Sequence, residues 1–413
     1  MEKKYQLFLH AVRCALLNQP LDPDMEADGH QMAAVLALAQ EHHVLPMIFE
    51  TVHDHPALQA MDQSVVDAIR GATIHTVMTQ AVKTVDLLRL TQQFRQKCLR
   101  PLVVKGIVCR NLYPKPDHRY SGDEDVLCDE ADFESIHNVL IHFGMQPATP
   151  SLESYEVPYQ MPDSPLYIEL HKSLFAKNSD VFSDCNRFFE HAFARSVDVD
   201  IRGMKVATLC HTDHLLYLII HAFKHFLHSG FGIRQLCDIS LFANAYGNQI
   251  DWDYVYEQCR SIRADYFAAA LFRIAEKHLV FSPEKSCQSP QWRNIKVDEW
   301  GLLEDMLCGG IYGSADRNRV HSSNMTLNAV AVNKKGKRSG KNILRTIFPR
   351  AVILEGRYPY LQRRKYLLPV AWVSRIFSFL KESICHKETA ASTVVRTGSK
   401  RIELLRQYHI IDR

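Results

Sequence analysis

Three acidic residues stand together at the start of an apolar run in the stretch RYSGDEDVLCDE. Side chains alternate between the two faces of a strand, so Asp123 and Asp125 are expected on one face and Glu124 on the other. Two carboxylates about 7 Å apart on one strand face repel each other unless they share a cation. A hard divalent ion takes oxygen ligands, so Asp123 and Asp125 are predicted to bind Mg²⁺ or Mn²⁺. A solvated acidic turn is the alternative that the spacing leaves open.

A third carboxylate is available in PLYIELHK, residues 165–172. In a strand, Tyr167, Glu169 and His171 share one face while the leucine and isoleucine residues share the other. An acidic residue on such an apolar strand favours a functional role if the strand lies beside DEDVLC. Glu169 is therefore the predicted third metal ligand.

Lys105 and Gly106 close a short β-branched run, LVVK, and precede a predicted helix. At a helix start, backbone N–H groups and a lysine side chain can hold phosphate oxygens. This dipeptide alone is a weak signal, and its value lies in its spacing from the acidic residues.

The stretch VVKGIVCRNLYPKPDHRYSGDEDVLC resembles the nucleotidyltransferase superfamily of the DNA polymerase β type, and more closely its uncharacterised bacterial branch. The positions that carry the resemblance are Lys105, Gly106, Tyr113, Pro114, Arg119, Gly122, Asp123 and Asp125. It continues into Glu169 and His171, with Lys172 where the branch has an aromatic residue, and into HLLYLIIHAFKHFL, RQLCDI and YPYLQRRKYLLPVAW.

The resemblance implies transfer of a nucleoside monophosphate from an NTP such as ATP to a hydroxyl acceptor, with two metal ions. Asp123, Asp125 and Glu169 would bind the metal. Lys105, Gly106, Arg119 and Gly122 would bind the nucleotide. One departure concerns nucleotide binding, because better-studied members carry Gly-Ser or Gly-Gly where this chain has Lys-Gly.

Nothing in the sequence specifies the acceptor, which the reaction allows to be a protein, an RNA, a sugar or a small molecule. Two other functions share the motif. One is a catalytically inactive nucleotide-binding or scaffold protein with the same fold, and the other is a metal phosphoesterase, which would release phosphate instead of pyrophosphate.

Four histidines, His214, His221, His225 and His228, recur at helical spacing in HLLYLIIHAFKHFLH. HAFKH lacks the glutamate of the H-E-x-x-H zinc motif, which disfavours a zinc protease. Lys224 and His225, together with His171, are predicted substrate contacts. Histidines satisfied in the helical core are the alternative.

The predicted fold class is α+β, a small mixed-sheet nucleotidyltransferase core flanked by N-terminal helices and a C-terminal helical domain. Apolar periodicity divides the chain as follows: N-terminal helical segment 1–99, core 100–180, helical domain 181–310, flexible basic linker or loop 311–342, and C-terminal helical tail 343–413. Within the core the order strand, helix, strand, helix, strand, strand is expected.

Composition adds little to the function. The chain has 413 residues, and its net charge of +3 gives no global field that would recruit nucleic acid. Its 11 cysteines form no C-x-x-C pair and no signal peptide is evident, so free thiols and a cytoplasmic location are expected. No membrane span is predicted, because the longest apolar run, 367–380, is short and contains Arg375. The oligomeric state is not predicted. Basic residues between 334 and 365 are interpreted as a solvated loop, and contact with RNA or a polyanionic acceptor is the alternative.

Overall fold

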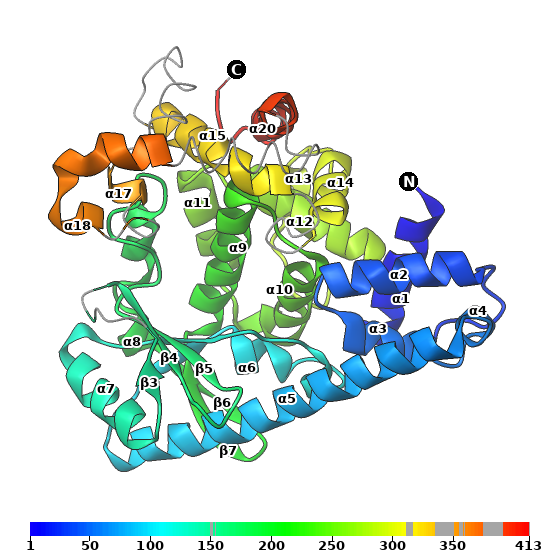
Figure 1. The fold of residues 1–413 in the computed structure, drawn as a ribbon, viewed down its shortest axis with the longest axis horizontal. Helices are drawn as coiled ribbons and strands as arrows, with labels where there is room; N and C mark the ends of the chain where they lie inside the picture. Colours follow the sequence, from blue (N-terminus) through cyan, green and yellow to red (C-terminus); the bar gives the residue numbers. More distant parts are fainter. Residues whose placement is uncertain are drawn as a thin grey trace.

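The computed structural model describes residues 1–148, 152, 154–310, 317–334, 351–354, 358, 360–374 and 391–412. It is an α+β fold, in which a mixed sheet lies between one long N-terminal helix and a larger C-terminal set of helices, with the other N-terminal helices to one side (Figure 1). The predicted fold class is therefore confirmed.

The N-terminal helices are α1 (Lys3–Leu16), α2 (Gly29–Glu41), α3 (Leu45–Val52), α4 (Pro56–Gln59) and α5 (Gln63–Gln96). Local sequence fixes where two of them begin: Asp28 and Gln31 form a capping box on α2, and the Asp62 side chain accepts a hydrogen bond from the Ser64 N–H on α5. Helix α5 is 34 residues long and runs from the other N-terminal helices to the sheet (Figure 1). The N-terminal segment thus connects directly to the core.

The sheet has five strands in the order β1-β2-β5-β4-β3. They are β1 (Leu102–Val104), β2 (Glu124–Leu127), β3 (Gln146–Pro147), β4 (Glu156–Gln160) and β5 (Tyr167–His171), with helices α6 (Gly106–Arg110) and α7 (Phe133–His142) between them. Strands β2 and β5 are parallel neighbours, and Asp125 is paired with Glu169. The other strand pairs of this sheet are antiparallel. Because β2 and β5 are parallel, corresponding side chains of DEDVLC and IELH lie side by side.

The segment predicted as a helical domain, 181–310, begins with a 3-10 helix (Ser183–Phe189) and the short helix α8 (Ala192–Arg195). A β-hairpin of β6 (Val197–Ile201) and β7 (Met204–Thr208) follows, which the prediction did not include. The apolar alternation in VDVDI and the turn at Arg202 and Gly203, both with positive φ, are the signals for this hairpin. The hairpin packs beside β1, where the Thr208 hydroxyl donates to the Val103 carbonyl at 2.6 Å.

The helical part that follows comprises α9 (His211–His228), α10 (Ile233–Tyr246), α11 (Trp252–Ser261), α12 (Asp265–His278), α13 (Pro290–Asn294) and α14 (Trp300–Gly309). Its core is aromatic, and the Phe226 and Phe267 rings stack with their centroids 5.0 Å apart. Helix α9 has one face in this core and its other face toward the sheet (Figure 1).

The prediction of a flexible linker at 311–342 is wrong for Arg317–Lys334, which forms helix α15. Its polar residues have partners inside the protein, which composition alone does not reveal: Arg319 is buried, 2.5 Å from Asp305, and donates to the Ser229 carbonyl. Lys334 pairs with Asp184 at 2.6 Å. The basic residues at 335–341 lie outside the described residues.

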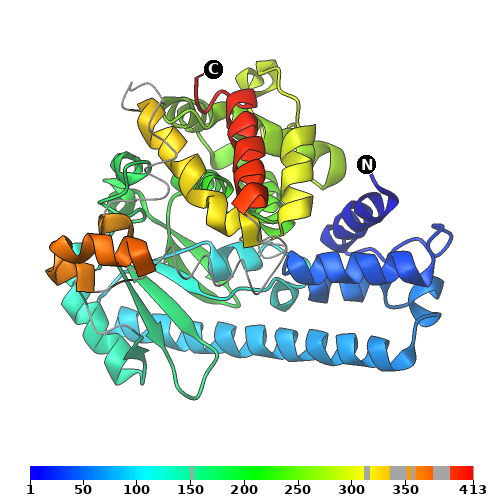
Figure 2. The ribbon, with the colours of Figure 1, turned by 45° about the horizontal axis from the view of Figure 1, so that its top comes forward.

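The described parts of the C-terminal tail are also helical: α17 (Ala351–Leu354), α18 (Tyr360–Arg363) and α20 (Ala391–Gln407). Helix α20 packs along α15 (Figure 2). Among the described residues, no helix is both long and apolar enough to cross a membrane.

Gly106 offers a test of how tightly β1, α6 and β2 pack. Its φ is +40°, and a Cβ there would overlap the Glu124 carboxylate, with Cδ only 2.8 Å away. Gly106→Ala should lower the free energy of unfolding by about 1–3 kcal/mol, because both the backbone and the contact are strained. Chemical denaturation measures the change.

The matched control is Gly71→Ala in the exposed middle of α5, where a Cβ would meet no atom within 4 Å. It should raise the stability by about 0.5–1 kcal/mol. Equal effects of the two substitutions would show that Glu124 does not press against Gly106.

Candidate functional site

A cavity of 530 Å³ opens between the sheet and helices α9 and α10. Of the residues that the sequence predicts as a site, all except Gly106 and Arg119 line it: Lys105, Gly122, Asp123, Asp125, Glu169, His171, Lys224 and His225. The fold therefore brings together residues separated by more than one hundred positions in the chain.

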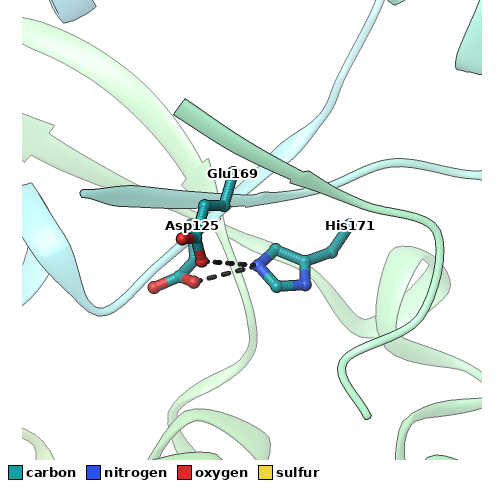
Figure 3. Close-up of side chains that lie close together, drawn as sticks. All are labelled: Asp125, Glu169 and His171. Atoms are coloured by element: carbon teal, nitrogen blue, oxygen red, sulfur yellow. Dashed lines mark hydrogen bonds and ion pairs between the residues drawn. The ribbon is translucent and has the colours of Figure 1, made fainter. Parts of the chain in front are cut away.

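The centre of the cavity wall is formed by Asp125, Glu169 and His171 on the parallel strands β2 and β5. His171 Nε2 lies 2.9 Å from Asp125 Oδ1 and 3.8 Å from Glu169 Oε2 (Figure 3). One potential ligand atom from each residue lies within 4.8 Å of those of the other two. Two carboxylates and an imidazole thus converge at one point of the wall.

Asp123 faces the same cavity but is not part of this group. It precedes the first residue of β2, in the turn after Gly122, so it has no partner in register on β5. The Ser121 hydroxyl donates to the Asp123 carbonyl at 2.7 Å and holds this turn. The expected cluster of three carboxylates is therefore replaced by two carboxylates and His171, with Asp123 beside them.

The Lys105 ammonium balances the two aspartates. Its Nζ is 2.5 Å from Asp125 Oδ2 and 3.9 Å from Asp123 Oδ2, and 3.3 Å from His221 Nε2. The nearby Lys105 ammonium holds the pKa of Asp123 down at about 2, despite burial. A side-chain cation thus offsets the repulsion that the sequence suggested a metal ion would offset.

Glu124 points away from the cavity, as strand alternation predicts. Its buried carboxylate accepts hydrogen bonds from Arg110 at 2.9 Å and from the Ile107 N–H at 2.7 Å. The Lys105 N–H donates to His214 Nε2 at 3.0 Å. The N–H groups of Lys105 and Ile107 are therefore engaged within the protein, and it is the Lys105 side chain that reaches the cavity. Gly106 is buried against Glu124 and does not line the cavity.

Arg119, predicted to bind phosphate, is instead buried in an ion pair. Its guanidinium donates two hydrogen bonds to Asp238, at 3.0 and 2.6 Å, and the Tyr113 hydroxyl donates to the same carboxylate at 2.8 Å. Arg119 thus ties the loop before the aspartates to helix α10. The arginine that lines the cavity is Arg234, which sequence reasoning missed.

Helix α5 also supports the site. Lys83 donates to the Ser121 and Gly122 carbonyls at 2.8 Å each, and Gln80 donates to Ser121 at 3.1 Å. Burial lowers the pKa of Lys83. The apolar pattern gave no signal for this, because Val82 and Val85 are exposed while Gln80 and Lys83 are buried.

The two groups beside Asp125 have shifted pKa values in opposite directions. Burial, together with Asp123 and Glu156, raises the pKa of Glu169 to about 7. Burial lowers the pKa of His171 to about 4, so the ring is neutral at pH 7 and its Nε2–H can donate to Asp125. His171 Nδ1 is buried and has no hydrogen-bond partner among the described residues.

This donor set fits a divalent cation. Carboxylate oxygens are the ligands that Mg²⁺ and Mn²⁺ prefer, and a histidine that holds a ligating carboxylate is a common supporting group. Burying Asp125 and Glu169 side by side is unfavourable without positive charge. Asp125 and Glu169 would hold the ion, with Asp123 near it and His171 orienting Asp125.

The rest of the cavity wall contains residues that the sequence did not indicate. Glu156 on β4 lies with its Oε2 3.8 Å from His171 Nδ1. Three tyrosines also line the cavity: Tyr155, Tyr167 and Tyr217. Tyr167 shares a strand face with Glu169, which is the signal that could have found it. Carboxylates, cations and aromatic rings therefore face one cavity.

Residues 28–279 match the protein family described as uncharacterised nucleotidyltransferases. The chain belongs to this family. The match extends from the residue before α2 to the end of α12 and contains every residue that lines the cavity. The family thus supports a role in nucleotidyl transfer. Comparisons with curated proteins and with solved structures gave no match.

Replacing Lys105 tests whether its ammonium neutralises the aspartates. The Lys105 and Asp125 side chains are only 12% and 3% exposed, so Lys105→Met should cost of the order of 3 kcal/mol without divalent ions, because it leaves buried carboxylates unpaired. Mn²⁺ or Mg²⁺ should restore much of this loss and bind more tightly than to the native protein. Thermal unfolding with and without each ion measures both effects.

Lys177→Met is the control, since Lys177 forms an exposed pair with Glu130. It should change neither stability nor ion binding measurably. The account of Lys105 is wrong if divalent ions stabilise both variants equally.

The raised pKa of Glu169 predicts how ion binding depends on pH. Because the ion displaces the proton, Mn²⁺ affinity should fall by up to about tenfold per pH unit as pH drops below the Glu169 pKa of about 7. Protonated Glu169 also stabilises the ion-free folded state at low pH, and this stabilisation is lost as the pH rises through the Glu169 pKa of about 7. Calorimetric titration from pH 5.5 to pH 8 measures the affinity.

Glu169→Gln removes the titrating group and keeps the volume. Its ion binding should be weaker than that of the native protein at pH 8 and nearly independent of pH over this range. A native-like pH profile in this variant would assign the proton to another group.

Proposed function

We propose that the cavity binds a metal–NTP complex and transfers the nucleoside monophosphate to a hydroxyl group. The observation that carries the proposal is the pairing of Asp125 with Glu169 on parallel strands at the wall of a cavity that also contains cationic side chains. Membership of a nucleotidyltransferase family supports it. The motif spacing further supports a place in the DNA polymerase β type superfamily.

The chain's own residues have separate roles in this proposal. Lys224 and Arg234 would bind the negative charge of the triphosphate, and burial lowers the pKa of Lys224. His171 would hold Asp125 in the orientation needed for binding. When bound, the divalent cation supplies Lewis acidity toward the phosphate oxygens.

Lys105 has two successive roles. In the ion-free protein Lys105 pairs with Asp125. Once Asp125 and Glu169 bind a cation, the Lys105 ammonium is free to contact phosphate. Before the metal ion and the substrate bind, the pair offsets the charge of Asp125. It also explains why the chain can carry a lysine where better-studied enzymes have a glycine.

The same ion pair favours a second candidate, an inactive protein that keeps the fold. If Lys105 remained on Asp125, nucleotide would bind without a metal ion and no transfer would follow. A metal phosphoesterase is the third candidate, and it would release phosphate instead of pyrophosphate.

The test is incubation of the purified chain with NTP labelled at the α-phosphate, and in parallel at the γ-phosphate, with Mg²⁺ or Mn²⁺ and cell lysate. The α-label should appear on an acceptor with release of pyrophosphate. Asp125→Asn should reduce this transfer at least about 100-fold because it removes a charged ligand and preserves volume. The exposed Asp132→Asn is the control and should have native activity.

Each other outcome has a distinct meaning. Release of free phosphate, with no label transferred, would indicate a phosphoesterase. Metal-independent nucleotide binding without transfer would indicate the inactive scaffold. Native activity in Asp125→Asn would show that the reaction takes place elsewhere.

A further inference from the structure

A second hollow adjoins the cavity. It has a volume of 440 Å³ and lies between α5 and the segment that joins α2 to α3. Two residues, His43 and Tyr120, line both this groove and the cavity. Their rings meet edge to face with centroids 4.9 Å apart. The groove and the cavity are therefore neighbours that meet at this pair of rings.

The groove differs from the cavity in its chemistry. Its α5 wall is formed by Ala68, Ile69, Ala72 and Thr76, and the facing wall includes Leu45, Pro46 and Gln40. Among the described residues, no acidic residue, lysine or arginine lines it. Burial and then Arg234 lower the pKa of His43 to about 4, so the imidazole is uncharged at pH 7.

The two hollows thus divide the ionic and apolar parts of the site. The cavity contains carboxylates together with Lys105, Lys224 and Arg234, which suit a metal–triphosphate complex. The groove has apolar walls and a few uncharged polar groups, the usual lining of a pocket for a small organic molecule. A polyanion gains nothing there, because sequence-independent binding of a nucleic acid depends on cationic side chains.

We infer that the groove binds the acceptor of the transfer reaction, and that this acceptor is a small uncharged molecule with an apolar body and a hydroxyl group. The inference rests on the proposed function. The body of the acceptor lies against Ile69 and Ala72, and its hydroxyl extends past the His43 and Tyr120 rings toward Asp125. The nucleotide occupies the cavity at the same time.

The transfer step balances with this arrangement. The acceptor oxygen forms a bond to the α-phosphorus, and the bond between that phosphorus and the oxygen bridging to the β-phosphate breaks. Pyrophosphate leaves, and the hydroxyl proton passes to water. No oxidant or further reactant is required.

Filling the groove tests the inference. Ala72→Trp places a large ring in the groove, and Ile74→Trp adds a ring on the same helix at a position that is 52% exposed and outside the groove. The probes are a panel of neutral aryl glycosides and aryl alcohols, the phosphorylated counterpart of each, and oligoadenylate. Ligand-observed NMR on the full chain measures their binding, and calorimetry measures binding of a non-hydrolysable NTP with Mg²⁺.

Neutral probes should bind the native chain and Ile74→Trp equally, and should bind Ala72→Trp at least tenfold more weakly. The Mg²⁺–NTP analogue should bind all three proteins equally. If Ala72→Trp does not fold, Ala68→Trp, another groove residue exposed on α5, replaces it.

The inference is overturned if no neutral probe binds the native chain, if neutral probes bind Ala72→Trp as well as the native chain, or if Ala72→Trp selectively loses the phosphorylated probes or oligoadenylate. Failure of the proposed function gives a different result. In that case the Mg²⁺–NTP analogue binds none of the three proteins, whatever the neutral probes do.

Discussion

The buried ion pair between Glu124 and Arg110 determines where the other acidic groups stand. Glu124 is fully buried and accepts hydrogen bonds from Arg110 and from the first turn of α6. Removing either partner would leave an uncompensated buried charge, which is strongly unfavourable. Because strand side chains alternate, fixing Glu124 on one face of β2 fixes Asp125 on the other. The ion pair therefore orients the carboxylate that faces the cavity.

Around that strand, the protein holds like charges close together and offsets them locally. Asp123, Asp125 and Glu169 face one cavity, and Lys105 lies between the two aspartates. Burial and the remaining repulsion raise the pKa of Glu169. Such crowding costs stability and is typical of functional sites rather than of structural ion pairs. The hydrogen bond from Lys83 to the Gly122 carbonyl and the Arg119–Asp238 ion pair hold the loop before Asp123 in place against this repulsion.

The sequence predicts a residue's role when the signal is local, and fails when the residue's partner lies far away along the chain. Strand alternation separates Glu124 from its neighbours, and an acid on an apolar strand marks Glu169, because both signals are local. The partner of Arg119 is 119 positions away, so a spacing motif could not distinguish a phosphate ligand from a structural ion pair. Helix α15 was missed for the same reason, since the groups that satisfy Arg319 lie on other segments.

The most direct test of this account is a crystal structure with Mn²⁺ and a non-hydrolysable NTP, in which anomalous scattering locates the metal ion. The account predicts an anomalous peak bounded by the Asp125 and Glu169 carboxylates, the triphosphate beside Lys224 and Arg234, and the Lys105 ammonium no longer paired with Asp125. A nucleotide bound away from β2 and β5, or a Lys105–Asp125 pair that persists with nucleotide in the cavity and no ion, would contradict it.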